Sequence, residues 1–486
     1  MNTEEKLFDN LRKIIIVLLP IPLIVGAVGY YNAGFPLADA IYYGVRLYGL
    51  EWEGGANNKY IEIARWTAPL LTAAGLAAFI ESVYVFLHNK WIGFLHKDTT
   101  AIYSSSGRGR ILNHNIPNSV VCAEKPLKHM KNHIILFDSD KENLLFYQRH
   151  KSFFQNGKYK SMVYLFLNEV DSNMLKQDFD NVSILNANDI IARALWKTVK
   201  LWNCAEKHRP QKVVILGFDA LGQRILRFGL QMNLYAKQQC MEYHIFGNSE
   251  LYEASHRYFQ TMNRDTITYH SEEDEDKWSI LGKADYIIVS KPATIELLQS
   301  LYYGCEKANI YYYSPANEKV TDYIKTDRLC AFGEDQLIYS NEYIKTDQLY
   351  EAAKKLNYRY ISSQTGAENK PEKQTAKEME EEWRKLDGFT KGSNISSSDY
   401  SEVIRELGSY GKENEDIVNL EELAELEHIR WCRYHLLNGW KYGVPADGKN
   451  KDMEKRIHKC ICPYAELSEE EKEKDRQVIK NDLKSE

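Results

Sequence analysis

The pattern of residues best suited to hold a phosphate lies in the middle of the chain. Gly217 and Gly222 bracket the turn GFDALG, which follows the apolar run Lys212–Leu216 and precedes a predicted helix at Gln223–Met232. Glycine permits the tight turn, and the helix N-terminus offers backbone N–H groups to a pyrophosphate. Asp219 stands where a second glycine is usual and brings a negative charge toward that anion. The turn therefore predicts either a weak dinucleotide site or a tight turn that binds nothing.

Side chains for catalysis and for metal binding form no comparable pattern. The sequence has no HExxH motif and no recognisable Ser/His/Asp set. Its 8 cysteines include no CxxC pair, and Cys460 and Cys462 alone do not make a zinc site. Dispersed cysteines fit reduced thiols better than a disulfide framework. We therefore expect neither enzymatic activity nor a bound metal.

Length and charge exclude other classes of protein. At 486 residues the chain is long enough for about three domains. Its 62 basic and 68 acidic side chains give a formal net charge of −6, so no global field attracts a nucleic-acid duplex. Hydrophobic residues make up 44%, which excludes wholesale disorder.

The elements that would position the turn alternate along the middle of the chain. Short β-branched runs are separated by helical stretches, a pattern typical of βαβ units around a buried parallel sheet. We expect a doubly wound, Rossmann-like α/β region at 101–345, with half-units that meet near residue 205 and a linker at Tyr103–Arg110. The predicted strands are His133–Phe137, Met162–Leu167, Val182–Leu185, Lys212–Leu216, Tyr243–Phe246, Thr266–Tyr269, Tyr286–Val289 and Ile310–Tyr313.

Two apolar stretches precede this region. Ile14–Ala33 and Trp66–Leu87 are each about 20 residues long, which as helix is one hydrocarbon thickness. The first could instead be a signal peptide, but its apolar run is long and has no evident cleavage site. Arg12 before the first stretch and Lys90 after the second predict that both termini are cytoplasmic. We expect residues 1–100 to form a two-span domain in the plasma membrane, with the lipid bilayer as its partner.

The segment between these stretches, Phe35–Leu50, is apolar at helical spacing but too short to span. A short helix that points back between two spans is the arrangement of a pore subunit. We therefore expect a pore-like re-entrant helix in a homo-oligomer, with a tetramer as the natural guess. Glu51 and Glu53 would then favour cations at the outer mouth of the pore. The alternative is an amphipathic helix on the bilayer surface with solvated acids.

The first hundred residues and the segment KVVILGFDALGQ together resemble the TrkA-N/RCK proteins, which regulate prokaryotic potassium channels and transporters. The resemblance covers roughly residues 100–340 and includes the turn described above. It implies an oligomeric cytosolic gating module with a degenerate nucleotide site. One function that follows is regulation of potassium or other ion transport in response to NAD(H) or ATP.

A second resemblance lies at the C-terminal end. Leu423–Gly443 reads LAELEHIRWCRYHLLNGWKYG, a helix with an Asn438-Gly439 C-cap, and LSEEEKEKDR follows further on. The E-H-x-R-W helix, the G-W-x-Y-G turn and the L-S-x-x-E-K-x-K-D-R helix start closely resemble the RyR domain, which takes its name from ryanodine receptors. We assign this domain to residues 346–486 and expect it to be mainly α-helical.

The RyR resemblance implies a set of ligand contacts. Arginine binds phosphate, histidine adds a donor, and Trp and Tyr faces stack on a base. The alternatives are that the aromatic residues are core packing and that Arg430 pairs with Glu427 at a spacing of three. The implied contacts are His428, Arg430, Trp431, Trp440, Tyr442, Asn394 and Arg476.

Together these features predict a sensor. A nucleotide-derived signal would bind the cytosolic RyR and Rossmann-like part and gate an oligomeric, channel-like effector in the bacterial inner membrane. The RyR resemblance implies a role in prokaryotic antiviral defence, with a cyclic oligonucleotide or an NAD- or ADP-ribose-derived nucleotide as the second messenger. The alternative is the RCK-type transport regulator.

Overall fold

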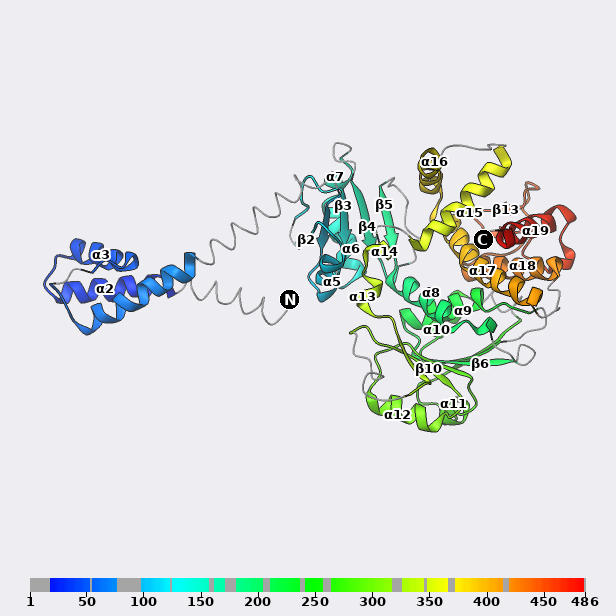
Figure 1. Ribbon diagram of the computed structural model, residues 1–486, viewed down its shortest axis with the longest axis horizontal. Coiled ribbons are helices and arrows are strands. Elements are labelled where there is room, and N and C mark those ends of the chain that lie inside the picture. Colours follow the sequence, from blue (N-terminus) through cyan, green and yellow to red (C-terminus); the bar gives the residue numbers. More distant parts are fainter. Residues whose placement is uncertain are drawn as a thin grey trace. The chain divides into compact units, whose positions relative to one another are not determined.

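The computed structural model divides the chain into two compact units (Figure 1). The first comprises residues 1–138 and 152–162, and the second comprises residues 139–151 and 163–486. The structure describes residues 18–52, 55–76, 98–122, 125–156, 161–170, 181–203, 210–236, 241–256, 264–316, 326–344, 348–365, 372–413 and 419–484.

The first unit begins with a bundle of short helices. These are α2 (Pro20–Asn32), α3 (Leu37–Arg46), the 3-10 turn η1 (Leu47–Gly49) and a helix at 59–76. Small residues let the helices approach closely, since a Cβ at Gly29 would lie 2.7 Å from Ile61 Cγ1 and one at Gly44 would lie 3.2 Å from the Leu23 carbonyl oxygen. Many large apolar side chains of these helices are exposed, among them Ile24, Leu37, Ile63, Trp66 and Leu70.

The predicted membrane spans are not found in this bundle. The helix α2 has 13 residues, which at 1.5 Å per residue is about 20 Å, against roughly 30 Å for the hydrocarbon core of a bilayer. Among the described residues, no helix combines the length and the apolar character needed to cross a membrane. The part of the second predicted span beyond residue 76 lies outside the described residues. The prediction of a two-span fold is therefore wrong, and so is the predicted location in the inner membrane with both termini cytoplasmic.

The predicted re-entrant helix corresponds to α3 and η1. Directly after η1, the Glu51 carboxylate accepts a hydrogen bond from Arg46 Nε at 2.8 Å, so the carboxylate belongs to a local ion pair. Glu53 lies outside the described residues. The predicted pore required the two spans, so it has no support from the described part of the chain.

The remainder of the first unit contains a parallel sheet that the sequence analysis missed in part. Strand β1 (Thr100–Tyr103) pairs in parallel with β2 (Ser119–Cys122) and with β3 (Asn132–Ile135). The helices are α5 (Gly107–Asn115) and α7 (Lys151–Phe154). The predicted linker Tyr103–Arg110 is wrong because β1 ends at Tyr103 and α5 begins at Gly107. A Cβ at Gly109 would lie 2.4 Å from Ser104 Cβ, so glycine permits a close contact here rather than marking a loop.

The second unit contains a doubly wound, Rossmann-like sheet. Its strand order is β11-β10-β9-β6-β7-β8, and all five pairs of neighbouring strands are parallel. With β6 as the first strand, this is the dinucleotide-fold order 6-5-4-1-2-3. The strands are β6 (Gln211–Leu216), β7 (Met241–Phe246), β8 (Thr266–His270), β9 (Tyr286–Val289), β10 (Asn309–Tyr313) and β11 (Leu329–Phe332), while β4 (Met162–Phe166) pairs with β5 (Val182–Leu185).

Helices cover this sheet. The sequence predicted a helix at Gln223–Met232, and the structure has α9 (Ala220–Met232), which begins three residues earlier. The other helices of the second unit that precede its C-terminal part are α6 (Asp140–Arg149), α8 (Ala187–Val199), η3 (Leu201–Asn203), α10 (Glu250–Ser255), α11 (Lys277–Leu281), α12 (Ile295–Gly304), α13 (Asp335–Ile338) and α14 (Asn341–Ile344).

The C-terminal part of the second unit is mainly helical. Helix α18 begins after Asn419, whose side chain accepts from the Glu421 N–H at 3.1 Å. It ends at Leu437, with Asn438 as the C-cap before Gly439 at φ +76°. The predicted C-cap is therefore confirmed. The elements are α15 (Gln348–Thr365), α16 (Glu372–Lys385), α17 (Gly388–Glu413), α18 (Leu420–Leu437), β12 (Lys441–Tyr442), β13 (Lys451–Asp452), β14 (Ile457–His458), η6 (Tyr464–Glu466) and α19 (Glu469–Lys484).

Buried charges join these C-terminal helices to the Rossmann-like part. Figure 1 shows α17 and α18 beside α8 and α9. Arg193 of α8 donates to both carboxylate oxygens of Asp399 on α17, at 2.6 and 3.0 Å, and both side chains are 2% exposed. Nearby, Lys200 Nζ lies 2.6 Å from Glu406 Oε1. A buried ion pair of this kind fixes the register of two elements because a shift would leave a charge without its partner.

Candidate functional site

The turn between β6 and α9 has the backbone of a phosphate loop. Gly217 has φ +95°, and a Cβ there would lie 2.6 Å from Ser290 Oγ. A Cβ at Gly222 would lie 2.3 Å from the Gly217 carbonyl oxygen. Both positions therefore exclude larger residues, as the sequence pattern indicated.

Asp219 places its own carboxylate at the N-terminus of α9. It is the N-cap residue, and its Oδ1 accepts a hydrogen bond from the Gly222 N–H at 3.3 Å. Helix N-termini attract anions, and here a side chain of the chain itself supplies the negative charge. Nucleotide binding by Gly217, Asp219 and Gly222 stays a prediction, but a phosphate would have to displace or accept this neighbouring carboxylate.

A similar arrangement occurs after β4. The buried carboxylate of Asp140 accepts three backbone N–H groups, from Asn168 at 2.7 Å, Glu169 at 2.8 Å and Val170 at 2.9 Å. Such N–H groups at the carboxyl end of a parallel strand are the usual contacts for an anionic ligand. In this half of the α/β region, too, a side chain already satisfies them.

A cluster of rings lies on one side of α18. Trp431 stacks on His428, with ring centroids 5.8 Å apart and planes at 15°, and lies 3.8 Å from His435. His458 of β14 meets the Trp431 ring edge-on at 4.9 Å. Trp440 stacks on Phe389 at 5.1 Å and contacts His435. We call His428, Trp431, His435, Trp440 and His458 the aromatic cluster.

The three histidines of the aromatic cluster differ in charge. Burial disfavours the His428 imidazolium, but hydrogen bonds with Asp475 at 3.3 Å and with Cys432 outweigh burial and raise the pKa of His428 to about 11. Burial lowers the pKa of His435 to about 3 and the pKa of His458 to about 4. At neutral pH the cluster therefore holds one cation and two neutral imidazoles.

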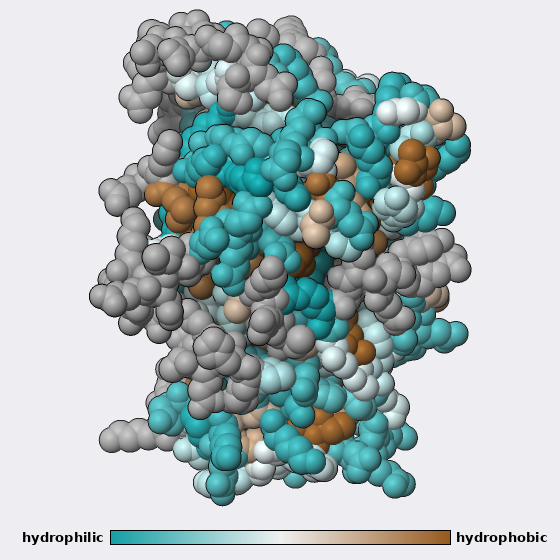
Figure 2. Space-filling model, turned by 90° about the vertical axis from the view of Figure 1, so that its right-hand side faces the viewer, coloured by the Kyte–Doolittle hydropathy of each residue, from teal (hydrophilic) through white to brown (hydrophobic). Residues whose placement is uncertain are grey.

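One side of the cluster reaches solvent beside the small sheet. Tyr442 is 60% exposed, and Trp431 is partly exposed. Tyr442 and Lys451 both pair with His458 across the strands, so the three residues share one face of the sheet. We call Trp431, Tyr442, Lys451 and His458 the aromatic face. Figure 2 shows the side of the molecule on the right of Figure 1 as mostly hydrophilic, with small separate hydrophobic areas.

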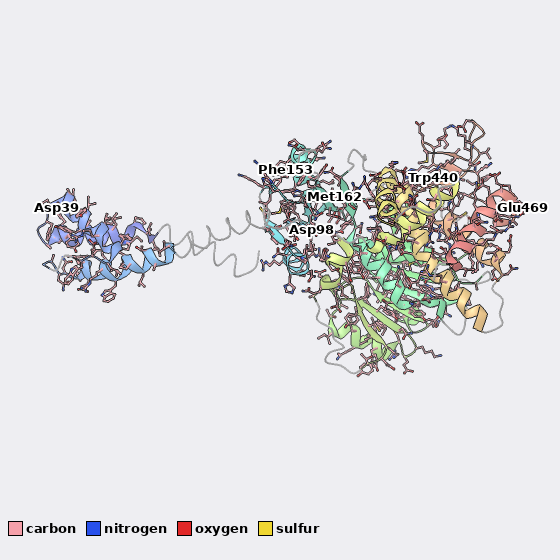
Figure 3. The ribbon with its side chains drawn as sticks, turned by 45° about the horizontal axis from the view of Figure 1, so that its top comes forward. Asp39, Asp98, Phe153, Met162, Trp440 and Glu469 are labelled. Carbon is pink, nitrogen blue, oxygen red and sulfur yellow. The ribbon has the colours of Figure 1, made fainter. Side chains whose placement is uncertain are left out.

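Trp440 lies deeper than the resemblance implied. It is 2% exposed, and Figure 3 places it among the C-terminal helices, whereas Glu469 lies at their outer margin. The packing of Trp440 between Phe389 and His435 agrees with the core-packing alternative. Of the predicted stacking residues, Tyr442 is exposed and Trp431 is partly exposed, with His428 and His435 lying against the Trp431 ring.

The two predicted arginine contacts are held by acids. Arg430 is buried on the side of α18 away from Trp431 and donates to both Glu427 carboxylate oxygens at 2.7 Å, so the alternative pairing at a spacing of three is confirmed. Arg476 of α19 donates to both Glu421 oxygens at 2.8 Å. A phosphate would compete with these carboxylates for either guanidinium group.

Asn394 is separate from the aromatic face. Its amide lies on α17 and donates to Asn357 Oδ1 at 3.4 Å. The structure thus brings His428, Trp431 and Trp440 together and places Asn394 on another helix. A ligand role for Asn394 stays a prediction.

Sequence reasoning missed three residues of this region. His435 lies one helical turn after Trp431, so spacing alone could have found it. His458 and Lys451 join the site only through the pairing of β14 with β12 and β13. A strand of two residues is too short to be predicted from its sequence pattern. Within the described ranges, no group of three His, Cys, Asp or Glu side chains is arranged to hold a metal ion.

Comparison with known proteins gives one family. The family model described as RyR domain matches residues 412–485. A search of curated proteins gave no match. Among solved structures, the dipicolinate synthase A chain from Bacillus subtilis is similar at 12% identity, over 52% of this chain and 97% of that chain, with a TM-score of 0.23.

The Rossmann-like assignment therefore rests on the strand order of the sheet. The RyR match, carried by a chain with a Rossmann-like α/β region, points to a ligand-binding regulatory protein.

Proposed function

We propose that this chain is a regulatory protein that binds a nucleotide-derived signal at the aromatic face of its RyR domain. Trp431 and Tyr442 would stack on a base, and Lys451 would attract a phosphate. The observation that carries the proposal is the juxtaposition of a partly exposed Trp431, a 60% exposed Tyr442 and a lysine on one small surface. Stacking of a base on an aromatic side chain is worth about 1–3 kcal/mol.

The charges around the aromatic face support an anionic ligand. The salt bridges of the described residues include none to Lys451 or Lys459, whereas Lys449 and Lys455 pair with Asp447 and Asp452. After burial as the first cause, Lys451, Lys459 and Lys474 lower the pKa of His458, while Glu471 raises it, so the lysines outnumber the acid around this ring. A phosphate therefore meets positive charge beside the rings without breaking a salt bridge found in the structure.

The β6–α9 turn is the weaker candidate for the same ligand. Its helix N-terminus already holds the Asp219 carboxylate, and an added phosphate would meet like charge. This argues against the alternative of an RCK-type ion-transport regulator that responds to NAD(H) or ATP. A cyclic oligonucleotide or an ADP-ribose-derived nucleotide at the aromatic face remains the proposed class of signal.

Native mass spectrometry of the full chain tests the proposal. The protein is purified from bacteria before and after phage infection, because the RyR resemblance implies antiviral defence. We expect a bound mass in the nucleotide range that is lost in the double variant Trp431→Ala, Tyr442→Ala and kept in the control Trp278→Ala, which removes an exposed tryptophan from α11.

The same spectra separate the alternatives. NAD or ATP bound equally before and after infection, and equally to wild type and double variant, would overturn the proposal in favour of the ion-transport regulator. A nucleotide present without infection but lost in the double variant would keep the binding site and remove the antiviral role. The mass of the assembly also tests the predicted homotetramer.

A further inference from the structure

Helix α18 has two opposite faces. At 100° per residue, His428, Trp431 and His435 lie on one face, and Arg430 and Arg433 lie on the other. The first face belongs to the aromatic cluster, whereas the second faces α9 and α17. A movement of α18 caused at the aromatic face would therefore also move the two arginines against α9 and α17.

Arg430 links α18 to α9 through a buried chain of hydrogen bonds. Its Nη1 donates to Ser396 Oγ of α17 at 2.7 Å, and this hydroxyl donates to Gln231 Oε1 of α9 at 2.5 Å. All three side chains are at most 3% exposed. Because water cannot replace these bonds without opening the interface, α18 and α9 cannot shift independently at low energy.

Arg433 makes the second link and is only partly satisfied. Its Nη1 donates to the Leu230 carbonyl oxygen of α9 at 2.7 Å and lies 2.8 Å from Asp265 Oδ2. Its Nε and Nη2 are buried and have no hydrogen-bond partner among the described residues. A buried donor left without a partner costs about 1–3 kcal/mol. We call this contact of Arg430 and Arg433 with α9 the seam, and it holds a guanidinium group with two donors that no described residue uses.

The other end of α9 is the turn with Asp219. Helix α9 runs from Ala220 to Met232, so the seam at Leu230 and Gln231 lies about 15 Å along the axis from the turn. The first-turn amides of Gly222 and Gln223 both donate to Asp219, to Oδ1 at 3.3 Å and to the carbonyl oxygen at 3.0 Å. A displacement of α9 would change these two hydrogen bonds, so the exchange rate of the two amides measures such a displacement.

We propose that α18 and α9 form a coupling element in which a change at the aromatic face alters the β6–α9 turn through Arg430, Ser396 and Gln231. The inference rests on the proposed function for its physiological trigger, a nucleotide at the aromatic face. The coupling itself is a property of the seam and exists without that trigger. Spatial continuity identifies the route, and only a measured dependence of one end on the other establishes it.

Hydrogen exchange followed by mass spectrometry on the full chain tests the coupling. Trp431→Ala perturbs the aromatic face, and the readout is the exchange rate of the amides of residues 222 and 223. We expect at least a threefold change in this rate, and we expect the change to disappear when Ser396→Ala is added. The control Trp278→Ala should leave the rate within 1.5-fold. If Ser396→Ala fails to fold, Gln231→Met breaks the same chain at its next link.

Two results would overturn the coupling. One is an unchanged rate at residues 222 and 223 in Trp431→Ala, with changes confined to the small sheet. The other is a change of the same size with and without Ser396→Ala.

The effect of ADP-ribose on hydrogen exchange in the wild type is a separate measurement. Failure to protect residues 440–460 counts against ADP-ribose as ligand and leaves the coupling result standing, whereas protection there with no change at 222 and 223 contradicts the coupling.

Discussion

The two places where a nucleotide was expected differ in what already occupies them. In the β6–α9 turn the backbone is arranged for an anion, but the Asp219 carboxylate caps the helix N-terminus. On the aromatic face, Trp431 and Tyr442 retain exposed ring surface, and no described acid pairs with Lys451. The comparison teaches that a backbone motif and a binding site are separate properties, because the side chains decide whether the N–H groups are still available.

Asp140 extends the comparison to the other half of the α/β region. Its carboxylate accepts three N–H groups after β4, so both halves supply their own anion at the carboxyl end of a strand. This favours a structural role for these two turns of the α/β region and agrees with the proposed ligand site at the aromatic face.

The largest expected effect comes from removing both rings of the aromatic face. Loss of stacking in Trp431→Ala, Tyr442→Ala should weaken binding of a nucleotide ligand roughly 100-fold, since each stacked ring contributes about 1–3 kcal/mol. Isothermal titration calorimetry measures the change. Asp219→Ala serves as the matched variant at the other place and should leave the Kd within twofold. Equal losses in both variants would abolish the distinction between the two places.

A smaller effect is expected from the lysines. Lys451→Ala with Lys459→Ala should weaken binding roughly tenfold at low salt and less at 0.5 M salt, because screening reduces exposed charge interactions. The control Lys449→Ala, Lys455→Ala removes cations that already pair with acids. A loss that does not depend on salt would show that the lysines act by packing rather than by charge.

Asp219→Gly tests whether the carboxylate closes the turn. Glycine is tolerated as an N-cap, so the free energy of unfolding should fall by only a few tenths of a kcal/mol. With the negative charge gone, we expect NAD or ADP binding at the turn to rise from undetectable to a Kd near millimolar, measured by ligand-detected NMR. Absence of binding would mean that the shape of the turn, rather than its charge, excludes the nucleotide.

The smallest effect is expected from pH. The His428 pKa of about 11 and the His435 and His458 pKa values of about 3 and 4 keep the charges of the aromatic cluster fixed between pH 6 and 9. The titration of these groups should therefore change the Kd for a nucleotide ligand less than twofold over that range. A larger change that follows a single titration near pH 7 and vanishes in His428→Gln would contradict the assigned charge.

Stability should nevertheless depend on pH, with opposite signs for these histidines. Folding raises the pKa of His428, so its contribution to stability is full below about pH 6.5 and is lost as the pH rises toward 11, at no more than about 1.4 kcal/mol per pH unit. Folding lowers the pKa of His435 and His458, so stability falls as the pH drops from about 6.5 toward 3. In urea unfolding experiments, the contribution of these residues to the free energy of unfolding should be greatest near pH 6.5. In His428→Gln, the free energy of unfolding should depend less on pH above 6.5.

Much of the fold could be predicted where the local sequence pattern is sufficient to identify a strand or a helix. Val182–Leu185 and Tyr286–Val289 are strands with the predicted bounds because short runs rich in β-branched and apolar residues favour strands. Tyr286–Val289 is fully buried in its parallel sheet, whereas most of Val182–Leu185 is half-buried at a sheet edge. β1 and α5 were missed because a Ser- and Gly-rich run resembles a linker, whereas Gly109 in fact permits a close approach to Ser104. The membrane spans were wrong because an apolar composition does not fix how long one continuous helix is.

The sequence by itself determined the alternation of strands and helices, the tight turn at Gly217 and Gly222, the C-cap of α18 and the ring-bearing residues of the RyR motif, because each depends on neighbours within a few positions. Tertiary structure alone decided which of those residues are accessible. It joined Arg430 to Ser396 of α17, placed Trp440 in the core, and brought Lys451 beside His458 across two short strands. Burial and pairing between distant segments are set by packing of the whole unit, which no local pattern encodes.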